Sequence, residues 1–294
     1  MDTSVKTVHY LGSKARMLSP IKRYIDELTH GNGRICDLFC GSGVVSEYLL
    51  QQYDVLAVDI QNYSKVYCEA RLLGLPKDFD YKGIIARIKE SETRRTNLII
   101  YKPILVYEDE CRDSLLSGEL EPIYEVIEKG SLYAYLNNLP YSETDLSPSL
   151  EKAFAMVKDT KGIDLQSLDS IITQYYGGLY FSFKQAIDID AISSYAFAQN
   201  ERVKNAMLAA LMGATTDVVN TIGKQFAQPL KVRNKDSSLK KNLAKKILSD
   251  RELDVFEQFE KWMQYYVELP QNTHDFEIIC DDYMEVLKRL QPDD

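Results

Sequence analysis

The chain has 294 residues, of which 45% are hydrophobic and 27% are charged, the composition of an ordinary globular protein with one large domain or one domain plus an insertion. The uncharged run at 205–216 is too short to cross a bilayer, and the first ten residues hold no apolar signal core, so we expect neither a membrane span nor secretion. A net charge of −9, taken alone, disfavours nucleic acid as a partner, but a local basic patch would count for more than the bulk charge.

Five cysteines are scattered through the chain without C-x-x-C spacing. An odd number in this arrangement is typical of a reducing compartment and does not form a zinc site. We therefore expect a cytoplasmic protein without a metal.

The pattern of residues 34–60 is strand, loop, helix, strand. "GRICDLFCGSG" predicts a buried strand at 35–39 that enters a glycine-rich turn, and "VVSEYLLQQ" continues at helical spacing. "YDVLAVDIQ" predicts a second strand that ends at Asp59. This order opens a doubly wound parallel sheet, so we expect an α/β fold.

From about residue 80 to 270 the pattern is mostly helical. Ser182 and Gln185 form a capping box that opens a helix, and "ERVKNAMLAALMGA" predicts a largely buried one. A last strand, 276–282, precedes a short helix. We therefore expect a sheet domain from 1–80 plus 272–294, interrupted by a mostly helical insertion at 81–271.

The glycine loop follows the first strand, at the edge where open α/β sheets bind ligands. Gly41 and Gly43 allow a tight turn, and Asp59 is placed to bind ribose hydroxyls. A dinucleotide site needs a third glycine where Ser46 stands, and its pyrophosphate gains nothing from a preceding Asp37. The pattern favours the cationic S-adenosylmethionine over NAD, with a purely structural turn as the remaining alternative.

Three segments in order, "HYLGSKARMLSPI", "DLFCGSG" and "VLAVDI", resemble the Dam-like alpha class of DNA N6-adenine methyltransferases. The resemblance implies a Rossmann-like fold that binds S-adenosylmethionine and double-stranded DNA, with the helical insertion as target-recognition region. It also implies three cofactor-binding roles. Tyr10 and Lys14 would pack over the methionine end, and Asp59 would bind the ribose. The glycine loop around the cofactor would be formed by Asp37, Phe39, Gly41 and Gly43.

Later segments extend the resemblance. Residues 175–192 and 223–235 look like parts of a subgroup of adenine methylases, and 278–287 resembles the strand whose Asp-aromatic pair, here Asp282 and Tyr283, borders the cofactor's adenine. The aromatic side chains near residue 175 are either core residues or face DNA, namely Tyr175, Tyr176, Tyr180 and Phe181.

A basic cluster lies between Lys231 and Lys246, where seven basic residues face one acid. Lysine and arginine contacts to phosphate supply most of the sequence-independent affinity for DNA, although a solvated helix face is the alternative. Together with the methylase motifs, the cluster predicts DNA-binding residues Lys231, Arg233, Lys235, Lys240 and Lys241.

N6-methylation needs a loop that holds the amino nitrogen of a base flipped out of the duplex. In the family this loop reads Asp/Asn-Pro-Pro-Tyr/Phe and follows the strand after the insertion. No D-P-P-Y or N-P-P-Y occurs in residues 1–294. Asn138-Leu139-Pro140-Tyr141 resembles the loop of ribosomal RNA adenine dimethyltransferases, but it requires 132–137 to be an interior strand. Its polar flanks favour a proline turn.

Three hypotheses follow. The leading one is the cofactor-binding and DNA-recognition subunit or portion of a DNA N6-adenine methyltransferase, whose D-P-P-Y loop is supplied by a second chain or lost by truncation. Such a split enzyme would expose an apolar surface at the unfinished sheet edge. The second is a complete RNA or DNA adenine methyltransferase using Asn138, Pro140 and Tyr141. The third is a non-catalytic DNA-binding protein derived from a methylase.

Overall fold

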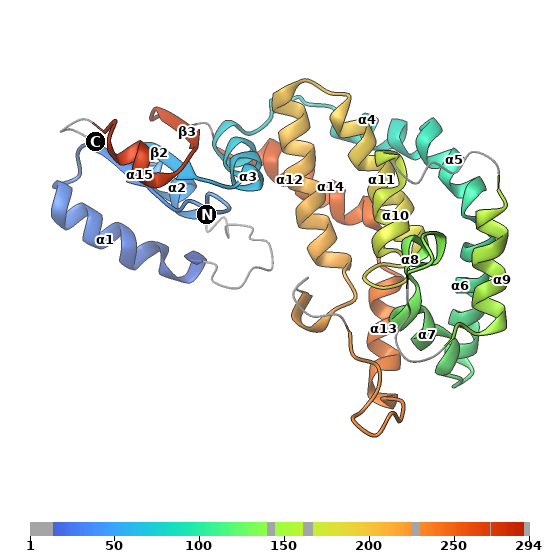
Figure 1. The fold of residues 1–294 in the computed structure, drawn as a ribbon. Coiled ribbons are helices and arrows are strands. Elements are labelled where there is room, and N and C mark those ends of the chain that lie inside the picture. Colours follow the sequence, from blue (N-terminus) through green and yellow to red (C-terminus); the bar gives the residue numbers. More distant parts are fainter. Residues whose placement is uncertain (1–13, 140–144, 161–166, 225–229, 271, 291–294) are drawn as a thin grey trace. The chain divides into compact units, whose positions relative to one another are not determined.

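The computed structural model describes residues 14–139, 145–160, 167–224, 230–270 and 272–290. The chain divides into two compact units: Met1–Tyr81, Ala198–Gly213 and Lys261–Asp294 form the first, and Lys82–Phe197 with Ala214–Glu260 form the second. The sheet lies in the first unit and most helices lie in the second (Figure 1). The boundaries expected from the sequence differ from this division at residues 81, 198–213 and 261–271.

The first unit contains a parallel sheet of β1 (Arg34–Asp37), β2 (Asp54–Asp59) and β3 (Phe276–Cys280) in the order β1-β2-β3. Asp37 pairs with Ala57, and Asp59 with Cys280, so the carboxyl ends of all three strands meet at one edge. This confirms the α/β class and a sheet to which the last strand returns. A doubly wound, Rossmann-like sheet needs more strands than these three, so that part of the expected fold stays a prediction.

Both faces of the central strand are covered, as a central parallel strand requires. Val55 and Ala57 pack on one face with Leu49 and Cys68, while Leu56 and Val58 pack on the other with Val286. The elements beside the sheet are η1 (Lys14–Met17), α1 (Leu18–Thr29), α2 (Val44–Leu49), α3 (Asn62–Leu73) and α15 (Tyr283–Leu287).

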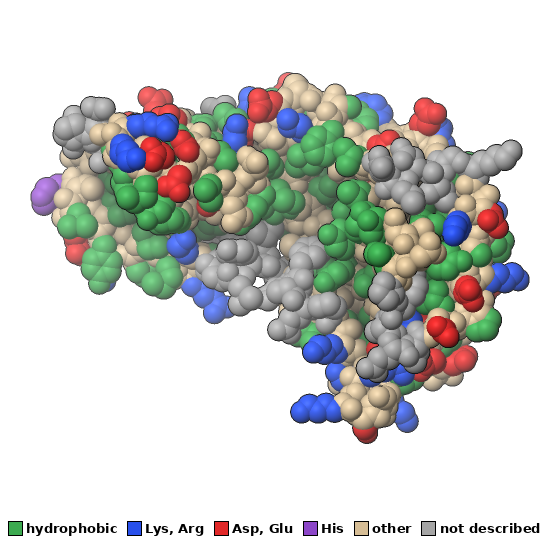
Figure 2. Space-filling view, viewed as in Figure 1, with side chains coloured by type: hydrophobic (Ala, Val, Ile, Leu, Met, Phe, Trp, Pro, Cys, Tyr) green, Lys and Arg blue, Asp and Glu red, His purple; other side chains and the backbone are tan. Residues whose placement is uncertain are grey.

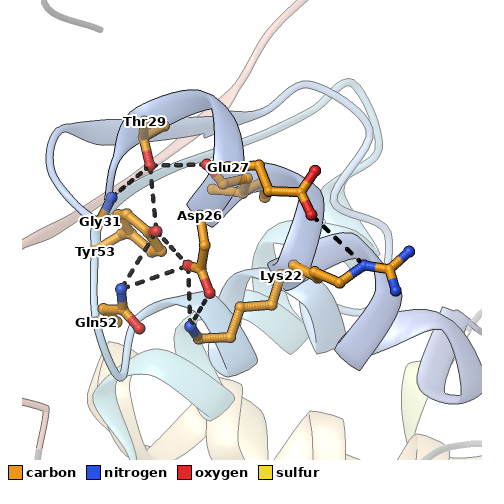
Figure 3. Close-up of polar contacts among 9 residues, drawn as sticks. Lys22, Asp26, Glu27, Thr29, Gly31, Gln52 and Tyr53 are labelled. Carbon is orange, nitrogen blue, oxygen red and sulfur yellow. Dashed lines mark hydrogen bonds and ion pairs between the residues drawn. The ribbon is translucent and has the colours of Figure 1, made fainter.

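A polar network fastens α1 to the turn before β2 (Figure 3). The buried hydroxyl of Tyr53 donates to Asp26 Oδ1 at 2.5 Å and accepts from Thr29 Oγ1 at 3.2 Å. Lys22 Nζ donates to both oxygens of Asp26, at 3.0 and 2.7 Å. These contacts hold α1, the helix that follows the "YLGSK" of the family resemblance, against the sheet layer.

The second unit is helical around one apolar core that includes Tyr124, Leu132, Phe154 and Phe183. Its elements are α4 (Tyr81–Lys89), α5 (Glu92–Ile100), α6 (Lys102–Leu116), α7 (Glu121–Lys129), α8 (Leu132–Leu136), α9 (Pro148–Lys158), η2 (Leu168–Ser170), α10 (Ile171–Tyr176), α11 (Phe183–Phe197), η3 (Ile222–Lys224), η4 (Lys241–Leu243) and α13 (Ala244–Arg251). Only the first residue of α4 falls outside this unit.

Helices α12 (Glu201–Val218) and α14 (Val255–Glu268) contribute residues to both units.

The prediction of a largely buried helix is confirmed, since Ala206, Met207 and Ala210 of α12 are at most 1% exposed. The capping box is also confirmed: Ser182 N donates to Gln185 Oε1 at 2.9 Å, and Gln185 N donates to Ser182 Oγ at 3.1 Å. Among the described residues, none of the helices has the length and apolar character of a membrane span.

Candidate functional site

Predicted cofactor residues from three strands come together at the carboxyl edge of the sheet. Asp37 ends β1, Asp59 ends β2, and Asp282 and Tyr283 follow β3. Tyr10 lies outside the described residues. Lys14 opens η1, which lies against α2, and its charge acts on the carboxylate of Asp37.

The glycine loop leads from β1 into α2. Its two glycines have positive φ angles, 54° at Gly41 and 72° at Gly43, which other residues adopt at a cost. A Cβ on Gly43 would lie 2.9 Å from Cys68 Sγ, whereas a Cβ on Gly41 would meet no atom within 4 Å. Gly43 therefore lets α2 pack against α3, and Gly41 leaves open space above the loop.

Asp59 orients the loop through backbone contacts. Its Oδ2 accepts a hydrogen bond from Gly41 N at 2.9 Å, and its Oδ1 accepts one from Gln61 N at 3.0 Å. Each carboxylate oxygen carries a second lone pair, so Asp59 keeps capacity to accept hydroxyl donors. The acid at the end of the second strand thus has the position and chemistry of a ribose-binding group.

Asp37 lies under the loop. Its Oδ2 accepts a hydrogen bond from Ser46 Oγ at 2.9 Å. Burial raises the pKa of Asp37, while the Ser46 hydrogen bond and the Lys14 charge act in the opposite direction. Ser46, noted in the sequence only as a missing glycine, is therefore a partner of the predicted acid.

Two aromatic side chains meet at the same edge. The rings of Phe39 and Tyr283 lie 5.0 Å apart at 51°, and they are 61% and 38% exposed. Asp282 caps α15, because its Oδ1 accepts from Met284 N at 2.8 Å. The edge thus presents exposed aromatic ring surface next to carboxylates, groups suited to the adenine and ribose of a nucleoside.

A buried ion pair supports α2 and was not anticipated from the sequence. The guanidinium of Arg71 donates to Glu47 and, at 2.9 Å, to the hydroxyl of Tyr265, which itself donates to Glu47 Oε1 at 2.9 Å. The pair links α2 to α3 and α14. The available indication of this ion pair was Arg71 itself, a charged residue within the otherwise largely apolar pattern of "VYCEARLL".

The basic cluster forms a hairpin before α13. Lys240 N donates to Val232 O at 2.9 Å, and Lys231, Lys235 and Lys241 are exposed. Figure 2 shows lysine and arginine side chains at this protruding tip. Arg233 instead forms ion pairs with Glu121 and Glu128, and Lys240 Nζ donates to Lys231 O at 2.8 Å. The predicted residues thus divide into exposed cations and cations used to hold the hairpin.

The alternative catalytic loop requires an interior strand at 132–137, which the described backbone does not form. The strand that it required is a helix, α8, which ends in left-handed Asn138 at φ 52°. Leu139 N donates to Ala134 O at 2.9 Å and Asn138 N to Tyr135 O at 3.2 Å, the pattern of a Schellman helix end. Asn138 therefore ends a helix, and Pro140 and Tyr141 lie outside the described residues.

A comparison with known protein families matches the part of the chain that contributes β1 and β2 to this sheet edge. Residues 10–102 match the model of the D12 class N6 adenine-specific DNA methyltransferases, and the matched range includes the glycine loop and Asp59. This confirms the resemblance predicted from the motifs. The chain is 37% identical over 70 residues to modification methylase LlaI of Lactococcus lactis subsp. lactis. It is 33% identical over 101 residues to modification methylase StsI of Streptococcus sanguinis.

These matches cover 24% and 34% of this chain. They span only 11% and 16% of the relatives' own lengths. No solved structure matches the chain significantly.

Proposed function

We propose that this chain provides the S-adenosylmethionine-binding and DNA-recognition parts of a DNA N6-adenine methyltransferase. The observation that carries the proposal is the convergence of Asp37, Phe39, Asp59 and Tyr283 at one edge of the parallel sheet. The family match of residues 10–102 supports the reaction class, and the exposed lysines of the hairpin support a polyanionic substrate.

The residues at the edge fit the cofactor. Asp59 has spare acceptor capacity for ribose hydroxyls, Phe39 and Tyr283 offer ring surface for adenine, and the space over Gly41 is open. The carboxylate of Asp37 favours a cationic ligand over a pyrophosphate. When bound, S-adenosylmethionine supplies the electrophilic methyl group.

Transfer to adenine requires groups that hold the flipped base, and no D-P-P-Y or N-P-P-Y stands in residues 1–294. We assign these groups to another polypeptide segment, such as a second chain. Within the described residues, β1 is an end strand of the order β1-β2-β3, the position at which a further strand would join the sheet. At the end of η1 and along α1, Met17, Tyr24 and Leu28 are 55%, 58% and 82% exposed, an apolar stripe suited to a covering segment.

Calorimetric titration of the full chain with S-adenosylmethionine tests the cofactor assignment. We expect saturable binding that Asp59→Ala weakens about tenfold or more, since a charge-assisted hydrogen bond is lost. Asp54→Ala, at the opposite end of the same strand, is the matched control and should bind as the wild type does. Absence of binding would favour a non-catalytic DNA-binding protein. Methylation of DNA by this chain alone would contradict the proposal that another polypeptide segment supplies the groups that hold the base.

A further inference from the structure

Four tyrosines in the second unit form a continuous aromatic surface, here called the tyrosine ladder: Tyr133, Tyr175, Tyr176 and Tyr180. The rings of Tyr133 and Tyr175 are stacked at 4.0 Å and 20°. Tyr176 lies 6.3 Å from Tyr175 and 5.9 Å from Tyr180. Tyr175 and Tyr176 are 37% and 43% exposed, whereas the neighbouring Phe181 is 3% exposed. Phe181, whose ring has no hydroxyl, thus lies in the core, and the tyrosines Tyr175 and Tyr176 lie at the surface.

The ladder is rigidly held from beneath. Asp190 of α11 accepts from the backbone N–H of Ile172 at 2.9 Å and of Thr173 at 2.8 Å, which fixes the start of α10. A Cβ on Gly178 would lie 3.0 Å from Gly130 Cα, so the turn after α10 packs directly on the backbone before α8. Helices α8 and α10 consequently lie side by side (Figure 1), and the ladder is preformed.

The ladder and the basic hairpin are both attached to α7. Tyr124 of α7 donates to Lys240 O at 2.6 Å, and Glu128 accepts from Arg233 Nε at 2.8 Å. Tyr124 and Gly130 are six residues apart, which is about 9 Å along a helix axis. The hairpin and the ladder are therefore anchored at neighbouring points of one helix.

We propose that the tyrosine ladder is a stacking platform for an unpaired nucleobase of the DNA substrate. Stacking on exposed rings is sequence-tolerant, because every base has a π-face, and it leaves sequence readout to other groups. The rigid arrangement suits this role, since little side-chain freedom is lost on binding. The inference rests on the proposed function and adds a contact for DNA that is separate from the cofactor edge.

The test uses the full chain and fluorescein-labelled DNA, either fully paired or with a short unpaired bubble that carries 5-iodouracil. We expect tighter binding to the bubble and long-wave ultraviolet cross-links within residues 130–139 or 170–182. Tyr175→Ala should weaken bubble binding by roughly 5- to 100-fold and abolish the cross-link, and Tyr175→Phe should retain both. Phe197→Ala, at an aromatic residue 63% exposed in the same unit and outside the ladder, is the matched control.

Circular dichroism and thermal unfolding of each variant separate lost stacking from lost folding. Equal affinity for bubble and paired DNA in the wild type, or unchanged cross-linking in folded Tyr175→Ala, would overturn the proposal. S-adenosylmethionine binding is measured on the same samples. If it persists while the ladder makes no contact with DNA, the inference fails and the cofactor assignment stands.

Discussion

The carboxylate of Asp59 accepts a hydrogen bond from the backbone N–H of Gly41 across 2.9 Å. This contact joins the end of β2 to the loop that follows β1, so the predicted ribose-binding acid also sets the shape of the glycine loop. A ligand that binds Asp59 consequently meets a loop whose backbone is already oriented, which lowers the cost of ordering it on binding.

The two loop glycines should respond differently to alanine. Both have positive φ, so each substitution strains the backbone by about 1–2 kcal/mol. Gly43→Ala also forces a Cβ to 2.9 Å from Cys68 Sγ, which adds about 1–3 kcal/mol of overpacking. Urea unfolding should show the larger loss of stability for Gly43→Ala. Gly41→Ala should mainly weaken S-adenosylmethionine binding, because its methyl enters the open space. Equal losses of stability would contradict this account.

Asp190 should make the stability of the chain depend on pH. Burial raises its pKa from 3.8 to about 6, although contacts from Thr173 and Ile172 favour the charged form. The folded state thus retains a proton that the unfolded state releases, so this stabilising contribution is complete below about pH 4 and is lost as the pH rises through about 6. The free energy of unfolding of the wild type should fall across that window by about 3 kcal/mol at most, relative to Asp190→Asn. Parallel curves for the two proteins would refute the assignment.

The sequence was sufficient to predict which residues meet at the carboxyl edge of the sheet, because local pattern and topology determine that grouping. Apolar runs mark the strands in the sequence, and the end of each run marks the end of its strand. Because parallel strands bring their carboxyl ends to one edge, Asp37, Asp59 and Tyr283 could be grouped in advance. Helix boundaries marked by a capping box, such as Ser182 with Gln185, were equally accessible.

Contacts between distant segments were not predictable in the same way. Arg71 and Tyr265 are 194 positions apart, and Arg233 finds its carboxylates 105 and 112 positions away. Nothing in the local pattern selects these partners. The four letters beginning at Asn138 also match a catalytic loop. Their polar flanks favoured a turn, and the helical backbone before them shows that Asn138 ends a helix.

Removal of the buried cation beneath α2 should be strongly destabilising. Arg71→Ala leaves Glu47 in a mostly buried site without its ion-pair partner, which costs about 3–5 kcal/mol. Arg23→Ala removes an arginine whose side chain is 66% exposed and should leave the unfolding midpoint unchanged. Chemical denaturation compares the two. A loss below about 1 kcal/mol for Arg71→Ala would mean that Glu47 finds solvent or another donor.

The exposed lysines of the hairpin should account for much of the salt dependence of DNA binding. Each phosphate contact contributes about 0.9 to the slope of log K against log salt, so replacing Lys231, Lys235 and Lys241 by glutamine should reduce that slope by up to about 3. The matched control replaces three exposed lysines elsewhere in the same unit, Lys82, Lys102 and Lys152, and should keep the wild-type slope.

Arg233→Gln should act differently from the lysine variants, because Arg233 is committed to Glu121 and Glu128. We expect a lower unfolding midpoint and a nearly unchanged salt slope for this variant. Fluorescence anisotropy at several salt concentrations measures the slopes, and thermal unfolding measures the midpoints. If the control triple and the hairpin triple lower the slope equally, the hairpin is a solvated surface and the phosphate contacts lie elsewhere.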